Sequence, residues 1–203
     1  MVTMREGIRS EEGAVLVEGL LVLPILVLVM AAFVEFGFAM FQWNQTVKAV
    51  QIGARQLAVS APILTSMTAF TADLGGLQAG VAVPATVVSV TCGAGTTACD
   101  GPGMTRLIQG SDGACDANIG GGVSGMCDFF PRLNAQNVRV TYRRDGLGYV
   151  GRPGGPVLSI TVETFGMTFD FLILDALIGA NSIPIPPHSV TFTSEDLLNG
   201  PPT

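Results

Sequence analysis

The stretch that decides the fold is GAVLVEGLLVLPILVLVMAAFVEFGF, which runs from Gly13 to Phe38. It contains no charged residue between Gly19 and Val34, and its apolar character continues beyond Glu35 as far as Trp43. A helix needs about 20 predominantly apolar residues to cross the hydrocarbon core of a bilayer. The stretch is long enough for this, and it predicts a single-pass membrane anchor.

A buried core helix and a cleaved secretory signal fit this stretch less well. A buried helix would need a large domain around it, because the stretch is apolar on every face and the rest of the chain is too small to enclose it. A secretory signal has an apolar region of about 7–15 residues that ends at a small-residue cleavage site. Here the apolar region is longer and continues without a break into further helical sequence. A membrane span remains the better interpretation.

The helix is predicted to continue past the membrane as a stalk, so that residues 14–60 form one element. Beyond the apolar stretch, hydrophobic residues recur at intervals of four, three, four and three: Trp43, Val47, Val50, Ala54 and Leu57. This spacing is typical of the narrow seam of a coiled coil. We therefore expect Val47 and Val50 to contact a partner helix.

Four cysteines follow in a glycine-rich region: Cys92, Cys99, Cys115 and Cys127. An even number of cysteines in a loop-rich segment is typical of disulfides formed in an oxidising compartment. Three pairings are possible. We favour Cys92–Cys99 with Cys115–Cys127, because shorter loops close at a lower entropic cost. A zinc site is disfavoured, since the C-x2-C spacing is missing and the one histidine, His188, is distant in sequence.

The orientation of the anchor follows from the cysteines. Basic residues flank both ends of the span in nearly equal number, Arg5 and Arg9 before it and Lys48 and Arg55 after it, so charge alone does not decide. Disulfides require the region beyond the span to be exported. We expect residues 1–13 to be a cytoplasmic leader and residues 61–203 to be a periplasmic domain, with the anchor in the inner membrane.

The exported region is predicted to be a small α+β domain with a mainly antiparallel sheet. Four segments are rich in β-branched residues and bounded by turn formers; they are residues 85–92, 137–144, 155–165 and 188–195. A short helix is expected over residues 170–179, which begin with Asp170 and end with Gly179. Residues 93–136 are predicted to form a solvated, disulfide-bearing loop.

Composition and motifs argue against several classes of function. The net charge is -6 and no basic run exceeds Arg143-Arg144, so we expect no nucleic-acid binding. The sequence has no G-x-S-x-G motif, no glycine-rich phosphate loop and no suggestive pair of carboxylates. Asp112, Asp116 and Asn118 lack the spacing of an EF-hand. We therefore expect no enzymatic activity, no catalytic residue, no cofactor and no metal site.

The boundary between the leader and the span carries a recognisable arrangement. The leader MVTMREGIRSEEG is polar and ends in Gly13, and Glu18 is the fifth residue after it. This arrangement resembles the signal of type IV-like prepilins. The resemblance implies that a prepilin peptidase cleaves between Gly13 and Ala14, and that Glu18 pairs with the N-terminal amine of a neighbouring subunit. The residues alone leave a second interpretation open, in which the Glu18 carboxylate simply reaches the membrane interface.

A longer part of the chain carries a related resemblance. Residues 13–55 resemble the N-terminal module of TadE-like pseudopilins of the tight-adherence (Flp) pilus system. The matching elements are Val17-Glu18, Pro24, Glu35-Phe36-Gly37, Ala49 and Gly53-Ala54-Arg55. Gly19 departs from the pattern, because the family commonly has an aromatic residue at this position. Glu35 has two open interpretations, solvation by lipid headgroups or contact with a partner helix that Gly37 allows to approach closely.

The resemblance implies a minor pilin or pseudopilin that assists assembly of an adhesive Tad-type pilus. Its partners would be other pilin or pseudopilin subunits, the pilus assembly machinery, a prepilin peptidase and the lipid bilayer. The alternative is a single-pass envelope protein unrelated to pili, whose periplasmic domain binds a ligand or an envelope polymer. Cleavage after Gly13 distinguishes the two, because the alternative gives no reason for it.

Overall fold

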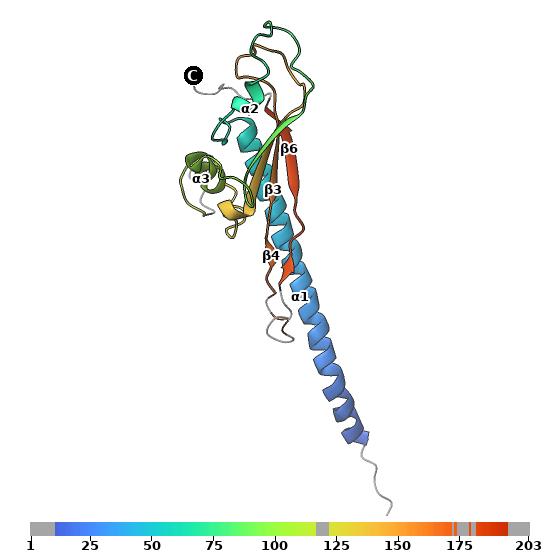
Figure 1. The fold of residues 1–203 in the computed structure, drawn as a ribbon. Helices are drawn as coiled ribbons and strands as arrows, with labels where there is room; N and C mark the ends of the chain where they lie inside the picture. Colours follow the sequence, from blue (N-terminus) through green and yellow to red (C-terminus); the bar gives the residue numbers. More distant parts are fainter. Residues whose placement is uncertain (1–10, 117–121, 172, 174–178, 180–181, 195–203) are drawn as a thin grey trace, which may run out of the picture. The chain divides into compact units, whose positions relative to one another are not determined.

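The computed structural model describes residues 11–116, 122–171, 173, 179 and 182–194, and of residues 11–15 it describes only the backbone. The elements, drawn in Figure 1, are α1 (Glu11–Ala58), α2 (Thr68–Thr71), β1 (Val88–Gly93), α3 (Gly101–Gln109), η1 (Ala135–Asn137), β2 (Val138–Arg144), β3 (Ser159–Thr164), β4 (Thr168–Phe169), β5 (Ile183–Pro184) and β6 (Ser189–Thr193). They divide into two compact units. Unit 1 comprises Met1–Met40 and Asp170–Ser182, and unit 2 comprises Phe41–Phe169 and Ile183–Thr203.

Helix α1 contributes to both units and confirms the predicted long N-terminal helix. It runs without interruption through Pro24 and ends at Ala58, four residues before Pro62. Its start at Glu11 lies slightly before the expected one, so the Gly13–Ala14 bond lies within the helical backbone. Leucine and alanine are among the strongest helix formers, which favours a continuous helix here despite one proline.

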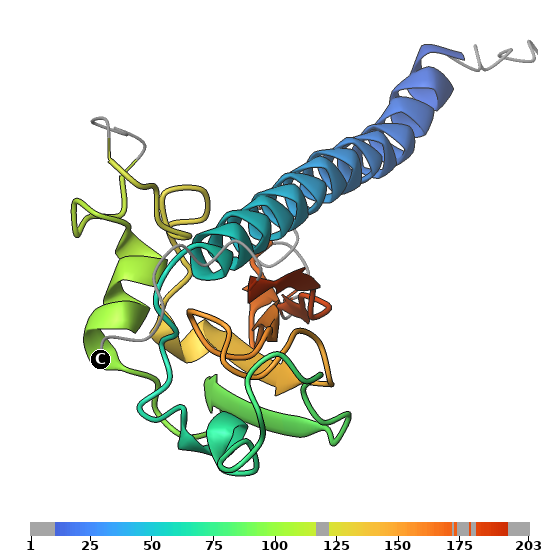
Figure 2. The ribbon, with the colours of Figure 1, turned by 90° about the horizontal axis from the view of Figure 1, so that it is seen from above.

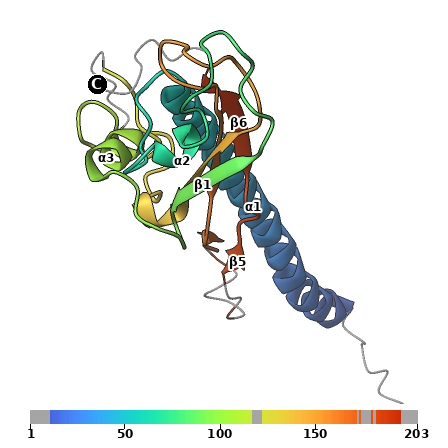
Figure 3. The same ribbon diagram turned by 45° about the horizontal axis from the view of Figure 1, so that its top comes forward.

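Unit 2 contains a four-stranded antiparallel sheet in the order β1-β2-β3-β6. All four predicted strands are thereby confirmed, with small differences at their ends. The strands twist past one another beside α1, as Figure 3 shows from a second side. Strands β4 and β5 form a separate two-stranded ladder.

The sheet buries one face against residues 41–58 of α1. Val140, Tyr142, Ile160 and Val162 alternate with more exposed residues along β2 and β3, as the period of two in a strand requires. They share a hydrophobic core with buried residues of α1, namely Ala49, Val50, Ala54 and Leu57. Figure 2 shows the helix over this face of the sheet. Unit 2 is thus a layer of helix on a layer of sheet.

The glycine-rich region contains a helix that the sequence pattern did not predict. Asp100 caps α3 by accepting a hydrogen bond from the backbone N–H of Gly103, 2.8 Å away. Met104, Leu107 and Ile108 are buried on one side of α3. The prediction of a solvated loop over residues 93–136 is therefore wrong for this part. The helix predicted over residues 170–179 lies mostly outside the described residues.

Both predicted disulfides are present. Cys92 is bonded to Cys99 and Cys115 to Cys127, so no cysteine is free. The first bond closes the loop after β1. The second joins the segment after α3 to Cys127, whose backbone N–H also donates to the carbonyl oxygen of Ile108.

Two polar side chains of β2, Tyr142 and Arg144, lie on its buried face. Each forms hydrogen bonds with different groups of unit 2. The Tyr142 hydroxyl accepts a hydrogen bond of 3.1 Å from the backbone N–H of Ile63, and burial raises the pKa of Tyr142 to about 12. The Arg144 guanidinium donates two bonds of 2.5 Å to the Asp73 carboxylate and one of 2.6 Å to the carbonyl oxygen of Phe70. This pairing lowers the pKa of Asp73 and raises that of Arg144.

Candidate functional site

The N-terminal half of α1 presents an apolar surface on every side. Its largest exposed side chains include Leu16, Val17, Leu20, Leu21, Leu23, Ile25, Leu26, Met30, Phe33 and Phe36. Within the described residues, one helix is long and apolar enough to cross a membrane, by length and composition alone. Its most apolar window is almost entirely unburied. These properties are consistent with a single-pass anchor.

Glu18 interrupts this apolar surface near its start. Its side chain is exposed, and its neighbours Val17 and Leu20 are 61% and 74% exposed. It makes no hydrogen bond or ion pair with another described residue. The predicted processing residues Gly13 and Ala14 precede it within α1, but their side chains lie outside what the structure describes. Among the described residues, the fold provides no compensating positive charge for Glu18.

Glu35 has an environment opposite to that of Glu18, although both residues lie on the same helix. Its side chain is only 2% exposed. Its Oε1 atom accepts a hydrogen bond from the backbone N–H of Ile173, a residue 138 positions later in the chain. Both residues belong to unit 1. Of the two interpretations of Glu35, solvation by lipid headgroups does not fit this environment, because the chain itself encloses the carboxylate and supplies a donor. The contact of Glu35 with a partner helix stays a prediction.

Gly37, just beyond Glu35 on the helix, has an open surface. No described atom lies within 4 Å of the place where a Cβ atom would stand. The close approach of another helix at Gly37 is sterically possible and stays a prediction.

The predicted helix seam is used inside the chain. Val50 has no exposed surface and packs in the core of unit 2, and Val47 is half-buried. The expectation that Val50 contacts a partner helix is thus wrong, because the sheet occupies that side of α1. The periodicity indicates correctly which side is buried, but an internal core and an intermolecular seam give the same apolar spacing.

Gly53 is a packing residue whose role the sequence alone does not reveal. A Cβ atom at this position would lie 2.5 Å from Sδ and 2.8 Å from Cγ of Met126, and 3.3 Å from Cδ1 of Leu107. Glycine therefore lets α1 approach Met126, and Leu107 of α3, closely. Gly53 belongs to the matching element Gly53-Ala54-Arg55, and this contact explains why a side chain is unfavourable there.

Aromatic and polar contacts fasten the first turns of α1 in unit 2. The ring of Trp43 meets that of His188 edge to face, with centroids 5.8 Å apart. Lys48 Nζ lies 4.7 Å from the centre of the Phe129 ring. The Gln42 side chain accepts a hydrogen bond of 3.1 Å from Arg132. His188 therefore packs against the helix, and among the described residues no three potential ligands gather into a metal site.

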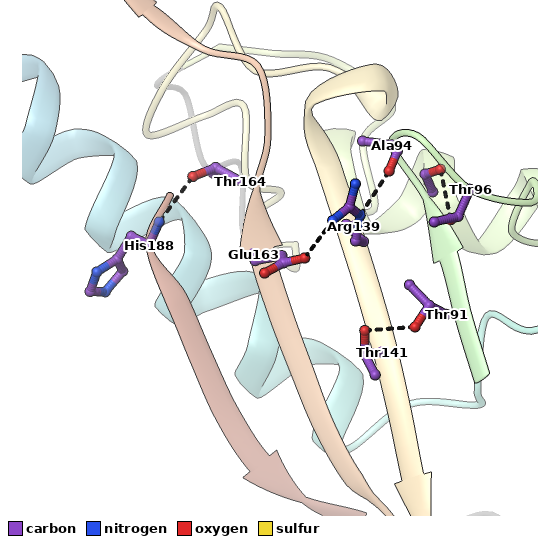
Figure 4. A network of polar contacts seen from close by, with 9 residues as sticks. Thr91, Ala94, Thr96, Arg139, Thr141, Glu163, Thr164 and His188 are labelled. Carbon is purple, nitrogen blue, oxygen red and sulfur yellow. Dashed lines mark hydrogen bonds and ion pairs between the residues drawn. The ribbon is translucent and has the colours of Figure 1, made fainter. Parts of the chain in front are cut away.

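The other face of the sheet is polar (Figure 4). Thr91 and Thr141 share a hydrogen bond of 3.0 Å. Thr161 and Thr191 share one of 2.8 Å. Arg139 pairs with Glu163 at 3.2 Å and donates from Nε to the carbonyl oxygen of Ala94. These groups mostly satisfy one another across neighbouring strands. They stabilise the sheet and do not converge on a common point.

A cavity of about 320 Å³ lies between the end of α1 and the start of α3. Its wall includes Gln56, Ser60 and Pro62 on one side and Asp100 and Arg106 on the other. The Gln56 amide donates to the carbonyl oxygen of Arg106, and Asp100 caps α3. The bond between Gln56 and Arg106 thus joins α1 to α3, and Asp100 stabilises the start of α3.

The comparison with known proteins agrees with the N-terminal resemblance. Residues 13–55 match the family described as TadE-like protein. No curated protein and no solved structure matches the chain. The match includes Glu18, Glu35, Gly37 and Gly53, and it stops just before the end of α1. Residues 13–55 of this chain are therefore TadE-like in sequence.

Proposed function

We propose that this chain is a non-catalytic minor pilin or pseudopilin that assists the assembly of a Tad-type adhesive pilus. Its N-terminus lies in the cytoplasm and its disulfide-bonded domain in the periplasm. The family match supports a role in such pilus systems. The two disulfides support an oxidising location for residues 61–203.

The observation that carries this proposal is the environment of Glu18. A carboxylate among lipid-facing residues costs roughly 2.5–3.5 kcal/mol on insertion scales. The cost falls when an opposite charge meets the carboxylate. Within the described part of the chain no such charge reaches Glu18. Cleavage after Gly13 would create an amine at Ala14, and a neighbouring subunit would bring that amine to Glu18 during assembly.

The proposal is tested by comparing two variants in cells that produce the pilus system. Gly13→Leu should block cleavage, retain the leader and abolish piliation. Glu18→Ala should mature normally, because the scissile bond is intact, yet also lose piliation through loss of the ion pair. Mass spectrometry of the mature N-terminus and electron microscopy of the cells provide the two measurements.

Gln51→Ala serves as the control, since Gln51 is an exposed residue of the same helix. It should process and piliate normally. Maturation of Gly13→Leu to an Ala14 N-terminus, or normal piliation by Glu18→Ala, would show that the chain does not act through a processed prepilin terminus.

A further inference from the structure

Arg55 ends the TadE-like match, and packing inside unit 2 does not account for it. Its neighbours Gly53 and Ala54 are buried, whereas Arg55 is exposed. Among the residues that the structure describes, its guanidinium has no ion-pair partner. The cation is therefore available to a carboxylate from outside the chain.

A cavity of about 510 Å³ lies beside Arg55 at the end of α1. Its wall is mostly apolar and comes from three parts of unit 2: Ile52, Ala58 and Val59 at the end of α1, Val123 after α3, and Phe192 of β6. Val59 and Val123 are 54% and 56% exposed. Apolar side chains gathered around an open cavity are typical of an interaction site.

Strand β6 borders this cavity through Phe192 and is an edge strand of the sheet. The His188 carbonyl oxygen accepts from Thr164 of β3, and the Ser194 N–H donates to the residue just before β3. Thr191 stands midway between these two residues, so its N–H and C=O groups face away from β3, because such groups alternate along an antiparallel strand. No described residue is hydrogen-bonded to them. The outer edge of β6 therefore offers an unpaired donor and acceptor.

The edge also lacks the side chains that protect free strands. The sequence of β6, SVTFT, contains neither a charged residue nor a proline, whereas the inner strands β2 and β3 do carry charges. Proteins commonly place charges or proline on a free edge, because its unpaired groups otherwise pair with another strand. A free, uncharged edge beside an apolar cavity fits an extended segment, which pairs along β6 and points every second side chain into the cavity.

We propose that the outer edge of β6 and the cavity beside Arg55 form a docking site for an extended segment of a second, different protein chain. The segment has apolar side chains at alternate positions, which enter the cavity, and a carboxylate that pairs with Arg55. The site goes beyond the proposed function and does not depend on a pilus or on cleavage after Gly13.

A β6 strand from another copy of this chain fits the edge less well. Strand β6 lies along α1, since His188 meets Trp43 and Phe192 shares the cavity wall with Ile52. Two β6 strands that pair in antiparallel direction would therefore reverse the direction of this helix between the copies. Copies anchored in one membrane share one direction of the helix.

Peptide binding to the full chain in nanodiscs tests the proposal. The probe is a short synthetic peptide in which valine and threonine alternate and the last residue is glutamate; it carries a fluorophore and a photoreactive benzophenone. Fluorescence anisotropy measures its affinity, and mass spectrometry identifies the residues to which it cross-links. One control peptide has the same residues with the valines placed together. A second control peptide has N-methyl groups on alternate backbone nitrogens, which removes the donors that would pair with β6.

The alternating peptide should bind several-fold more tightly than either control peptide and should cross-link to β6 and to the end of α1. Absence of binding, equal binding of the control peptides, or cross-links confined to other parts of the chain overturns the proposal. Association of the chains with one another that excludes the peptide also overturns it, because the occupant is then a second copy. The processing variants Gly13→Leu and Glu18→Ala should bind the peptide normally, so a failure of the proposed function leaves this result unchanged.

The role of Arg55 is tested with the same peptide and with a version that ends in glutamine. Arg55→Gln should weaken binding of the glutamate peptide several-fold and leave binding of the glutamine peptide unchanged, because only the former has a carboxylate. Lys48→Gln, at another exposed cation of α1, is the matched control and should affect neither peptide. Equal losses for both peptides in Arg55→Gln, or no loss for either, overturn the pairing with Arg55. Val59→Asp, at an exposed wall residue, should weaken both peptides, and unchanged binding there excludes the cavity as the site.

Discussion

Single residues of β2 show how polar groups are kept inside the core of unit 2. Tyr142 and Arg144 stand on the buried face of the strand, where hydrophobic residues are the usual occupants. Each has a specific partner: the Ile63 N–H for the hydroxyl, and Asp73 with the Phe70 carbonyl for the guanidinium. Both contacts reach the connection that follows α1. They therefore tie the helix–sheet connection to the sheet.

Tyr142→Phe should lower the free energy of unfolding by about 1–3 kcal/mol, because it leaves the buried Ile63 N–H without an acceptor. Unfolding by denaturant in detergent measures this. In the original chain the pKa of Tyr142 is about 12, above its ordinary value of 10.0, so the unfolded chain ionises first. The contribution of Tyr142 to the free energy of unfolding should be fully present below pH 10 and should be lost as the pH rises toward 12. The Tyr142→Phe variant should not show this loss between pH 10 and 12. Tyr149→Phe, at an exposed tyrosine, should change neither the free energy of unfolding nor its dependence on pH.

At the scale of elements, α1 is a single helix with two kinds of surface. Its first half exposes apolar side chains all round, and residues 41–58 bury one side against the sheet and α3. Glycines on the helix reflect this difference. Gly37 has open space around it, whereas Gly53 stands where Met126 and Leu107 approach closely.

Gly53→Ala should destabilise unit 2 by about 1–3 kcal/mol, since the new methyl group overlaps the fully buried Met126 side chain. Gly37→Ala is the matched control on the same helix. It meets no described atom and replaces glycine by a better helix former, so it should leave the unfolding of unit 2 unchanged. Thermal unfolding of both variants in detergent gives the comparison. Equal stability of the two would mean that Met126 does not pack against α1 at Gly53.

At the scale of the whole molecule, two disulfides reinforce the part of unit 2 with the least regular structure. Cys92–Cys99 closes a loop of sequence separation 7 beside the sheet edge, and Cys115–Cys127 closes one of separation 12 beside α3. Neither bond joins the loop after β1 to the segment after α3. Cys92–Cys99 should therefore stabilise the loop after β1, and Cys115–Cys127 should stabilise the segment beside α3.

Non-reducing peptide mapping of the membrane-extracted protein should find only the pairs Cys92–Cys99 and Cys115–Cys127. Replacing both members of either pair by serine should cost about 2–4 kcal/mol, because the unfolded chain gains the freedom of the opened loop. The pair Cys115–Cys127 should affect the protection of α3 amides in hydrogen exchange, and Cys92–Cys99 should not. A peptide that joins Cys99 to Cys115, or free thiols throughout, would contradict this arrangement.

Local sequence signals predicted most of the fold. Runs such as VRVTYRR and SITVET carry β-branched residues at a period of two, and the disulfides followed from the short loops that they close. Helix α3 was not predicted because its nine residues, GPGMTRLIQ, contain two glycines and a proline. The available signals were the Asp100 cap, a proline in the first turn and the spacing of Met104, Leu107 and Ile108.

The candidate site was less predictable, for physical reasons that differ between residues. Glu18 stood out because a charge in an apolar run is costly wherever it occurs. The partner of Glu35 is a backbone N–H at Ile173, and every residue except proline carries such a donor, so no sequence pattern identifies it. For Val50, an apolar stripe predicts burial but not whether the covering surface belongs to the same chain.

The continuity of α1 through Met40 and Phe41 has a mechanical consequence. Helical backbone continues from Met40 to Phe41 without a break, so tension applied at the N-terminal end travels along hydrogen-bonded backbone. It reaches the folded domain at Ala49, Val50 and Ala54, which have no exposed surface. Pulling residues 41–58 away from the sheet would therefore require these residues to leave the core, which would unfold unit 2.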